Sequence, residues 1–116
     1  MKQLAQFLKL FSDETRLRCI YLIYTNKSLC VCELTHALDL SQPKISRHLT
    51  SLRNLGVIND KRIGHWVYYS INDKLDKQQS EILTAIIDNV KSSQLSEVDV
   101  KRLNGMKNRP KMLNCC

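Results

Sequence analysis

The sequence predicts a mainly α-helical domain with one small β-hairpin. The chain has 116 residues but only 3 Gly and 2 Pro, and aromatic residues make up 6%. This composition disfavours a many-turned β-sandwich or a Gly-rich nucleotide-binding fold. Helical spacing of apolar residues recurs along most of the chain. With 43% hydrophobic and 25% charged residues, the chain has the balance of one globular domain.

Two helices are predicted before residue 27. The second begins at Ser12 or Asp13 and runs to about Asn26, because acidic residues are favoured in the first turn of a helix. Its high apolar content makes it the central core helix, in which Cys19 is expected to be a buried thiol. The first helix has an apolar stripe at i, i+3, i+4 and i+7, which consists of Leu4, Phe7, Leu8 and Phe11.

A short third helix and a clearly signalled fourth helix follow. The third comes after an extended entry over residues 29–32. The fourth begins after Ser41, a good N-cap residue, tolerates Pro43 in its first turn and ends near Gly56, which suits a helix C-terminus. The apolar positions of these two helices are Leu34, Ala37, Leu38, Ile45, Leu49 and Leu52.

The β-rich residues 57–71 predict a hairpin that turns near Gly64, with Trp66, Tyr68 and Tyr69 on its second strand. Helical spacing returns from Lys74 to Lys91. Residues 93–116 are polar and basic with little periodicity, so we expect a flexible, Cys-terminated tail after a folded domain of residues 1–92.

This order of elements is that of a helix-turn-helix with a wing. The first and last predicted helices carry more apolar surface than one small core needs, so a homodimer is expected. The residues expected at the dimer interface are Leu4, Leu8, Phe11, Ile82, Ile86 and Val90.

Basic residues are concentrated in two parts of the chain. The net charge is +7, and residues 41–70 contain five basic residues against one acidic residue. Residues 91–116 are also basic, which makes nucleic acid the expected partner. Arg47 is expected to contact a guanine, whereas His48 is expected to pack beneath its helix. The candidate DNA-binding residues are Gln42, Lys44, Ser46, Arg47, Thr50, Lys61, Arg62 and His65.

Other functional classes lack support in the sequence. No apolar run approaches the roughly 20 residues that cross a bilayer, and the N-terminus has no secretory cleavage pattern, so a cytoplasmic protein is expected. A reducing cytoplasm makes the 5 Cys candidates for metal or redox chemistry rather than for structural disulfides. No P-loop, H-E-x-x-H motif or Ser/His/Asp order is present, so an enzyme is not expected.

Cys30 and Cys32 are two thiols separated by one residue. In a regular helix they would lie roughly 200° apart, and in a strand they would lie on opposite faces. Both can bind one ion only where the backbone is irregular, and a helix N-terminus supplies such a place and favours thiolate. Without further context, such a pair is more typical of two small apolar residues at the edge of a core.

The segment LCVCELTHALDLSQPKISRHLTSLRNLGVINDKRIGHWVYYSI resembles the arsenic-responsive branch of the ArsR-type winged-helix metalloregulators. The most specific parts are CVCEL at residues 30–34, SQPKISRHL at residues 41–49 and the wing around Gly64. The resemblance covers about Leu4 to Val90. It implies a dimeric repressor that binds an inverted-repeat operator without a cofactor. The repressor would control a metalloid-resistance operon and leave the DNA when As(III) or Sb(III) binds.

The resemblance also implies that Cys30 and Cys32 are ion ligands, but the third ligand is not evident. Where a third cysteine often follows in relatives, this chain has Thr35, with Glu33 and His36 alongside. Three thiolates suit As(III) or Sb(III), whereas mixed thiolate, imidazole and carboxylate sets suit Zn(II).

Cys115 and Cys116 are candidates for the missing sulfur ligand. The alternative is that these two thiols have no function. The His and carboxylate site that relatives use on the last helix is disfavoured, because the predicted helix from Lys74 to Lys91 contains no His.

Three functions remain open. The first is a metalloid-released repressor, and the second is a thiol redox switch on the same fold. The third is a soft-metal buffer or scaffold protein whose winged helix binds another protein. The redox switch requires reversible oxidation of Cys30 or Cys32 without an ion. The polar, basic face of the fourth helix argues against the third function, because a protein-binding face is usually more apolar.

Overall fold

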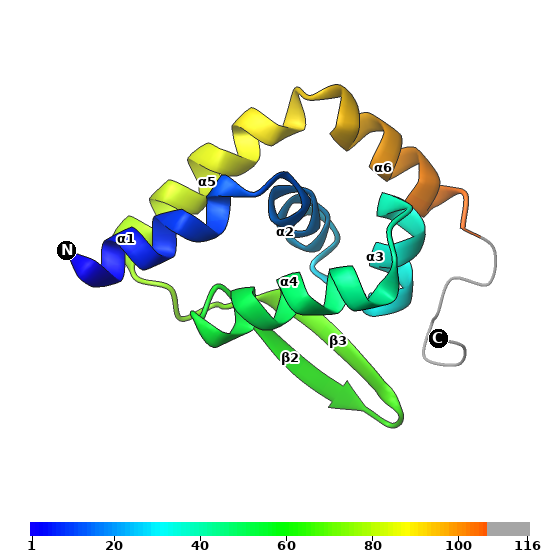
Figure 1. The fold of residues 1–116 in the computed structure, drawn as a ribbon, viewed down its shortest axis with the longest axis horizontal. Helices are drawn as coiled ribbons and strands as arrows, with labels where there is room; N and C mark the ends of the chain where they lie inside the picture. The colour runs from blue at the N-terminus through cyan, green and yellow to red at the C-terminus, as the bar shows by residue number, and fades with distance from the viewer. Residues whose placement is uncertain (107–116) are drawn as a thin grey trace.

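The computed structural model describes residues 1–106, which fold around one central helix, α2 (Figure 1). Figure 1 shows α1 and α5 at one end of the molecule, α3 and α6 at the other, and the hairpin of β2 and β3 projecting away from the helices. No helix in this part of the chain is long and apolar enough to cross a membrane. The elements, in chain order, are α1 (Lys2–Lys9), η1 (Leu10–Ser12), α2 (Glu14–Asn26), β1 (Ser28–Cys30), α3 (Val31–Leu38), α4 (Gln42–Asn54), β2 (Ile58–Ile63), β3 (Trp66–Ile71), α5 (Lys77–Lys91) and α6 (Gln94–Asn104).

Side-chain caps fix the starts of α2 and α4, of which the sequence predicted the cap at Ser41. The Asp13 carboxylate accepts a hydrogen bond from the backbone amide of Arg16 at 3.0 Å, and the Ser41 hydroxyl accepts one from the amide of Lys44 at 3.4 Å. These bonds satisfy backbone donors that have no partner inside the helix. Gly56 follows α4 with φ of +80°, a left-handed conformation in which glycine has no Cβ penalty.

Two predicted boundaries shift by a few residues. α5 begins only at Lys77, because Asp76 and Gln79 form a capping box in which each side chain accepts a hydrogen bond from the other residue's backbone amide, at 2.8 and 3.1 Å. The extended entry to α3 ends at Cys30, and the helix starts directly at Val31.

The predicted hairpin is part of a three-stranded antiparallel sheet with the order β1-β3-β2. β1 was not expected as a sheet strand. It places Leu29 opposite Tyr69 and Cys30 opposite Tyr68, and directly opposed residues lie on the same face of a sheet. Leu29 belongs to the hydrophobic core and Tyr69 packs against it. The other face of the sheet therefore carries Cys30 and Tyr68.

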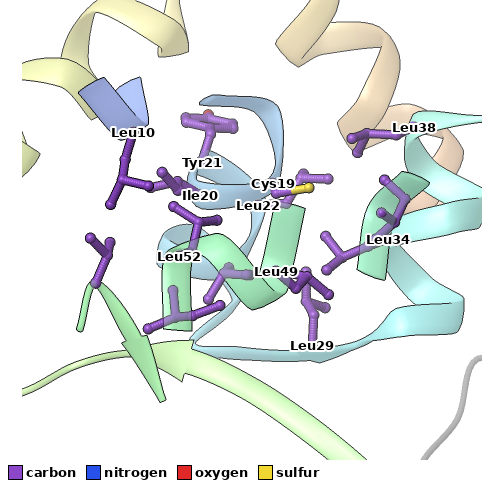
Figure 2. Close-up of a cluster of buried hydrophobic side chains, with 14 of the residues drawn as sticks. Leu10, Cys19, Ile20, Tyr21, Leu22, Leu29, Leu34, Leu38, Leu49 and Leu52 are labelled. Carbon is purple, nitrogen blue, oxygen red and sulfur yellow. The ribbon is translucent and has the colours of Figure 1, made fainter. Parts of the chain in front are cut away.

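The core lies where α2, α3, α4 and the sheet meet (Figure 2). Cys19 is completely buried there, which confirms the prediction for this thiol. Each apolar side chain removed from water in this way contributes roughly 1.5–3 kcal/mol of transfer free energy. The labelled members of the cluster in Figure 2 are Leu10, Cys19, Ile20, Tyr21, Leu22, Leu29, Leu34, Leu38, Leu49 and Leu52.

The expected flexible tail is wrong for residues 94–104, which form α6 and pack against α3 and α2. The folded unit therefore does not end at residue 92. Ser93 caps the helix, and its hydroxyl accepts a hydrogen bond from the amide of Ser96 at 3.1 Å. The buried residues of α6 are Ser96, Asp99 and Leu103, so its inner face is largely polar. A search for apolar spacing could not detect such a helix.

Candidate functional site

α4 turns a polar and basic face away from the core. Its apolar side chains Ile45, Leu49 and Leu52 are completely buried, which leaves the predicted DNA-binding side chains on the opposite face. The Thr50 hydroxyl donates to the Ser46 carbonyl at 2.9 Å, so it offers only acceptor lone pairs to a base. Four of these side chains are exposed and Ser46 is half-buried. The exposed ones are Gln42, Lys44, Arg47 and Thr50.

His48 lies on the inner side of α4, beside the start of α2. Its Nδ1 atom is 3.4 Å from Arg16 Nη1, and its Nε2 atom is 3.8 Å from a carboxylate oxygen of Asp13. Burial lowers the pKa of His48, while the nearby Asp13 carboxylate acts in the opposite direction. Arg16 also donates through Nε to the Leu10 carbonyl at 2.8 Å. His48 therefore connects α4 to the start of α2, in agreement with its expected packing role.

The wing carries exposed basic side chains. Gly64 closes its turn with φ of +64°, and no atom lies within 4 Å of the position a Cβ would take. Arg53 of α4 is 3.1 Å from Asp60 of β2, which joins the base of the wing to α4. The wing residues predicted to bind DNA are exposed, namely Lys61, Arg62 and His65. Lys61 and Arg62 are neighbours on one strand, so their side chains leave opposite faces of the hairpin.

Cys30 and Cys32 lie at the junction of β1 and α3. Cys30 is the N-cap residue of α3 with extended backbone angles, φ −96° and ψ 171°, whereas Cys32 is already helical. The two cysteines are therefore neither both in a helix nor both in a strand. Cys30 is buried and Cys32 is half-buried. The Glu33 carboxylate accepts a hydrogen bond from the Cys30 amide at 3.1 Å. Both cysteines are disulfide-bonded in this structure.

Cys19 differs chemically from these two cysteines. It is a free thiol, and burial raises its pKa to about 12. Thiolate is the form that reacts and binds metals. Cys19 is therefore inert near neutral pH and does not belong to the site.

The third ligand is not found among the residues discussed so far. The Thr35 hydroxyl donates to the Cys32 carbonyl at 2.9 Å, and His36 is exposed. Within residues 1–106, no three His, Cys, Asp or Glu side chains come together as a metal site. Cys115 and Cys116 lie outside the described residues.

A groove of about 720 Å³ runs between α1 and α5, and its lining includes Leu4, Phe7 and Ile82. Leu4 and Leu8 are 43% and 44% exposed, which is high for leucines on an otherwise amphipathic helix. Of the other residues predicted for a dimer interface, all are half-buried, namely Phe11, Ile82, Ile86 and Val90. Leu4 and Ile82, which line this groove, are therefore left partly uncovered by the described residues.

Sequence reasoning missed two features of these sites. The first is Tyr68, which the sequence places on a hairpin strand but which lies opposite Cys30. The second is Arg16, which contacts His48 across 32 residues of sequence. Both relationships depend on long-range pairing, for which the sequence contains no local signal.

Comparison with known proteins decides the family. Residues 13–60 match the family model described as bacterial regulatory protein, arsR family. Over 108 residues the chain is 43% identical to the arsenic resistance transcriptional regulator ArsR1 of Pseudomonas putida, and the match covers 93% of this chain and 83% of that protein. The chain belongs to the ArsR family. This ArsR-family chain is also 44% identical over 78 residues to the arsenical resistance operon repressor of Escherichia coli, covering 67% of each protein.

The fold of this ArsR-family member is shared by solved structures. HlyU from Vibrio cholerae superimposes with a TM-score of 0.68 at 24% identity, covering 78% of this chain and 95% of that chain. The match to ArsR1 confirms the predicted family, and this superposition confirms the winged helix-turn-helix fold. As an ArsR-family member with this fold, the chain is a DNA-binding transcriptional regulator.

Proposed function

We propose that this ArsR-family regulator is a homodimeric repressor of a metalloid-resistance operon, released from its operator when As(III) or Sb(III) binds reduced Cys30 and Cys32. The observation that carries the proposal is the position of the two thiols, at the strand–helix junction that begins α3. α3 packs on α4, which bears the exposed basic face. The relatives named for arsenic resistance support the choice of ion.

The DNA-binding part of the proposal rests on the shape and charge of α4 and the wing. A helix with one polar face fits the major groove, where Arg47 offers a bidentate donor for guanine. Gln42, Lys44, Ser46 and Thr50 supply further donors and acceptors around it. Lys61, Arg62 and His65 of the wing contact the phosphate backbone or the minor groove, and the phosphate contacts add affinity without reading sequence.

The dimer part of the proposal rests on the exposed leucines of α1 and on the groove between α1 and α5, which both apolar and polar residues line. A second copy of the chain would cover Leu4 and Leu8, and a twofold axis would then relate the two α4 helices. An inverted repeat in double-stranded DNA matches that symmetry.

The ion-sensing part of the proposal rests on the chemistry of the Cys30 and Cys32 thiols. Soft thiolate ligands suit As(III) and Sb(III), and a reducing cytoplasm keeps both thiols available. Because Cys30 is extended and Cys32 is helical, drawing both sulfurs onto one ion rearranges the first turn of α3. That change moves α3 against α4 and reduces the affinity for DNA.

Cys115 or Cys116 is a candidate for a third sulfur ligand. Arg102 near the end of α6 is 4.0 Å from Asp39 at the C-terminal end of α3. α3 is about 12 Å long at 1.5 Å per residue, and the segment from Met106 to Cys115 spans at most roughly 30 Å. A tail thiol of the same chain therefore has the reach to arrive at the start of α3.

The test is fluorescence anisotropy of a labelled duplex from the protein's own promoter, bound by fully reduced protein during an arsenite titration. We expect arsenite to release the wild-type protein, and the double variant Cys30→Ser, Cys32→Ser to stay bound. Cys19→Ala removes a different thiol and serves as the matched control, which should respond like wild type. Release of the double variant at wild-type arsenite concentrations would contradict the proposed site.

A second candidate is the same repressor released by thiol oxidation. The observation in its favour is that Cys30 and Cys32 are disulfide-bonded in the structure. Peroxide applied with a metal chelator present would release the DNA under this alternative, and a reductant would restore binding. A protein that stays bound to the DNA in peroxide would contradict this second candidate function.

A further inference from the structure

Tyr68 lies directly across the sheet from Cys30. The pairing of β1 with β3 sets Cys30 opposite Tyr68 and Leu29 opposite Tyr69. Directly opposed side chains share a face and have Cβ atoms about 4.5–5.5 Å apart. Because Leu29 and Tyr69 are on the core side, Cys30 and Tyr68 occupy the face that carries the candidate thiol site.

The hydroxyl group of Tyr68 is buried and makes no hydrogen bond to any described residue. A buried hydroxyl almost always has a partner, because one left without it loses its hydrogen bonds to water. The hydroxyl group of Tyr69, the adjacent tyrosine on the opposite face, is not a buried group without a hydrogen-bond partner. The position of the unpaired hydroxyl on the face of Cys30 indicates a partner that arrives with a ligand.

Arsenite chemistry supplies such a partner. In neutral water As(III) is arsenous acid, As(OH)₃. Reaction with two thiols forms two As–S bonds, breaks two As–O bonds and releases two water molecules, without any change of oxidation state. The third oxygen stays on the arsenic as a hydroxyl group, which can accept a hydrogen bond.

We propose that Tyr68 is a residue of the inducer site and that its hydroxyl donates a hydrogen bond to the oxygen retained by As(III) on Cys30 and Cys32. The inference rests on the proposed function and deepens it, since it adds a residue that recognises the third position of the ion. It also provides a reason for a site with two cysteines, where Thr35 replaces a third.

Phenylarsine oxide separates this role from a general packing role. It reacts with two thiols to form two As–S bonds and one water molecule, and a phenyl group then occupies the third position. The product has no oxygen on arsenic, so Tyr68 has no acceptor there. The two probes share the thiol chemistry and differ at the atom assigned to Tyr68.

The experiment measures the affinities of reduced, full-length protein for arsenite and for phenylarsine oxide by isothermal titration calorimetry. Tyr68→Phe removes only the hydroxyl, and Tyr69→Phe makes the same change on the core face as the matched control. We expect Tyr68→Phe to weaken arsenite binding roughly five- to tenfold, the effect of one hydrogen bond, and to bind phenylarsine oxide no more weakly than wild type. Tyr69→Phe should leave the ratio of the two affinities unchanged.

Two results would overturn the assignment. One is arsenite affinity unchanged in Tyr68→Phe, as expected if a tail thiol displaces the last oxygen. The other is an equal loss of affinity for both probes, which indicates packing. Failure of the proposed function is detected separately, because Cys30→Ser would then bind arsenite as wild type does. Unliganded Tyr68→Phe should bind the promoter duplex normally, which verifies that the variant is folded.

Discussion

Arg18 of α2 and Asp99 of α6 form a two-pronged ion pair, with Nε 2.9 Å from Oδ2 and Nη2 2.8 Å from Oδ1. The same Nη2 atom donates to the carbonyl of Leu38 at the end of α3, at 3.1 Å. The hydrogen bonds that Arg18 donates to the Asp99 carboxylate raise the pKa of Arg18, and the Asp99 side chain is only 1% exposed. One guanidinium group thus fixes α3 and α6 to the central helix.

Replacement of Asp99 by Ala should destabilise the fold by about 3 kcal/mol, because it leaves the largely buried charge of Arg18 without its partner. Urea denaturation followed by circular dichroism measures this loss. Arg102→Ala breaks an exposed pair with Asp39 at 4.0 Å and is the control, with an expected effect below about 1 kcal/mol. Equal midpoints for the two variants would contradict the assigned role of Asp99.

The stability of the protein should fall as the pH drops below about 6.5, the usual pKa of histidine. Burial lowers the pKa of His48, so between these two pKa values the unfolded chain binds a proton that the folded chain does not. Stability is therefore complete above about pH 6.5 and declines as the pH falls to the folded pKa. Thermal unfolding of wild type and His48→Gln at pH 7.5 to 5 measures the effect.

His48→Gln should remove that part of the pH dependence. Asp13 does not interfere. Burial raises its pKa, but the hydrogen bond from the Arg16 amide and the charges of His48 and Arg16 outweigh burial and lower the pKa overall. The contribution of Asp13 to the stability of the fold is present above the unfolded pKa of Asp, about 3.9, and is lost only as the pH falls below that value. An unchanged slope between pH 6.5 and 5 in the variant would show that another group is responsible.

The affinity for operator DNA should depend steeply on salt. If about three cations per protomer neutralise phosphates, the slope of log K against log salt in a dimer is near −5. Arg62→Ala should reduce its magnitude by about 2 and weaken binding to every sequence alike. Arg47→Ala should instead reduce discrimination between operator and mutated operator by about 1–3 kcal/mol.

Lys91→Ala at the end of α5 is the control for that titration, since Lys91 is exposed and lies on neither α4 nor the wing. Anisotropy at several salt concentrations provides the slope for wild type and for the variants Arg62→Ala, Arg47→Ala and Lys91→Ala. A slope unaffected by Arg62→Ala would exclude the wing from the phosphate contacts.

Leu8→Glu should convert the protein from dimer to monomer, because it places a charge in the apolar surface of α1. Sedimentation equilibrium measures the mass of the assembly. Leu95→Glu changes a leucine of similar exposure, 39%, on α6 and should leave the assembly intact. A Leu8→Glu variant that remains dimeric would place the interface elsewhere.

The sequence predicted the elements whose signals are local. Ser41, Pro43 and Gly56 marked α4 because caps and turn residues act within a few positions. β1 has three residues, too few for an alternating pattern to be visible. α6 buries Ser96 and Asp99, whose burial depends on partners far away in the sequence.

The candidate site divides in the same way. The thiols and the polar face of α4 could be found from residue type and spacing. The pairing of Cys30 with Tyr68 could not, because strand register is set by how distant segments pack.

The central position of β3 has a genetic consequence. Tyr69 and Ile71 pack against the core, whereas Tyr68, the neighbour of Tyr69, shares the side of Cys30. In a screen of promoter–reporter cells, polar changes at residues 69 and 71 should lower the amount of regulator and leave the reporter on without inducer. Changes at residue 68 should keep the reporter off and raise the inducer dose that switches it on. Adjacent codons of one short strand would then yield opposite phenotypes.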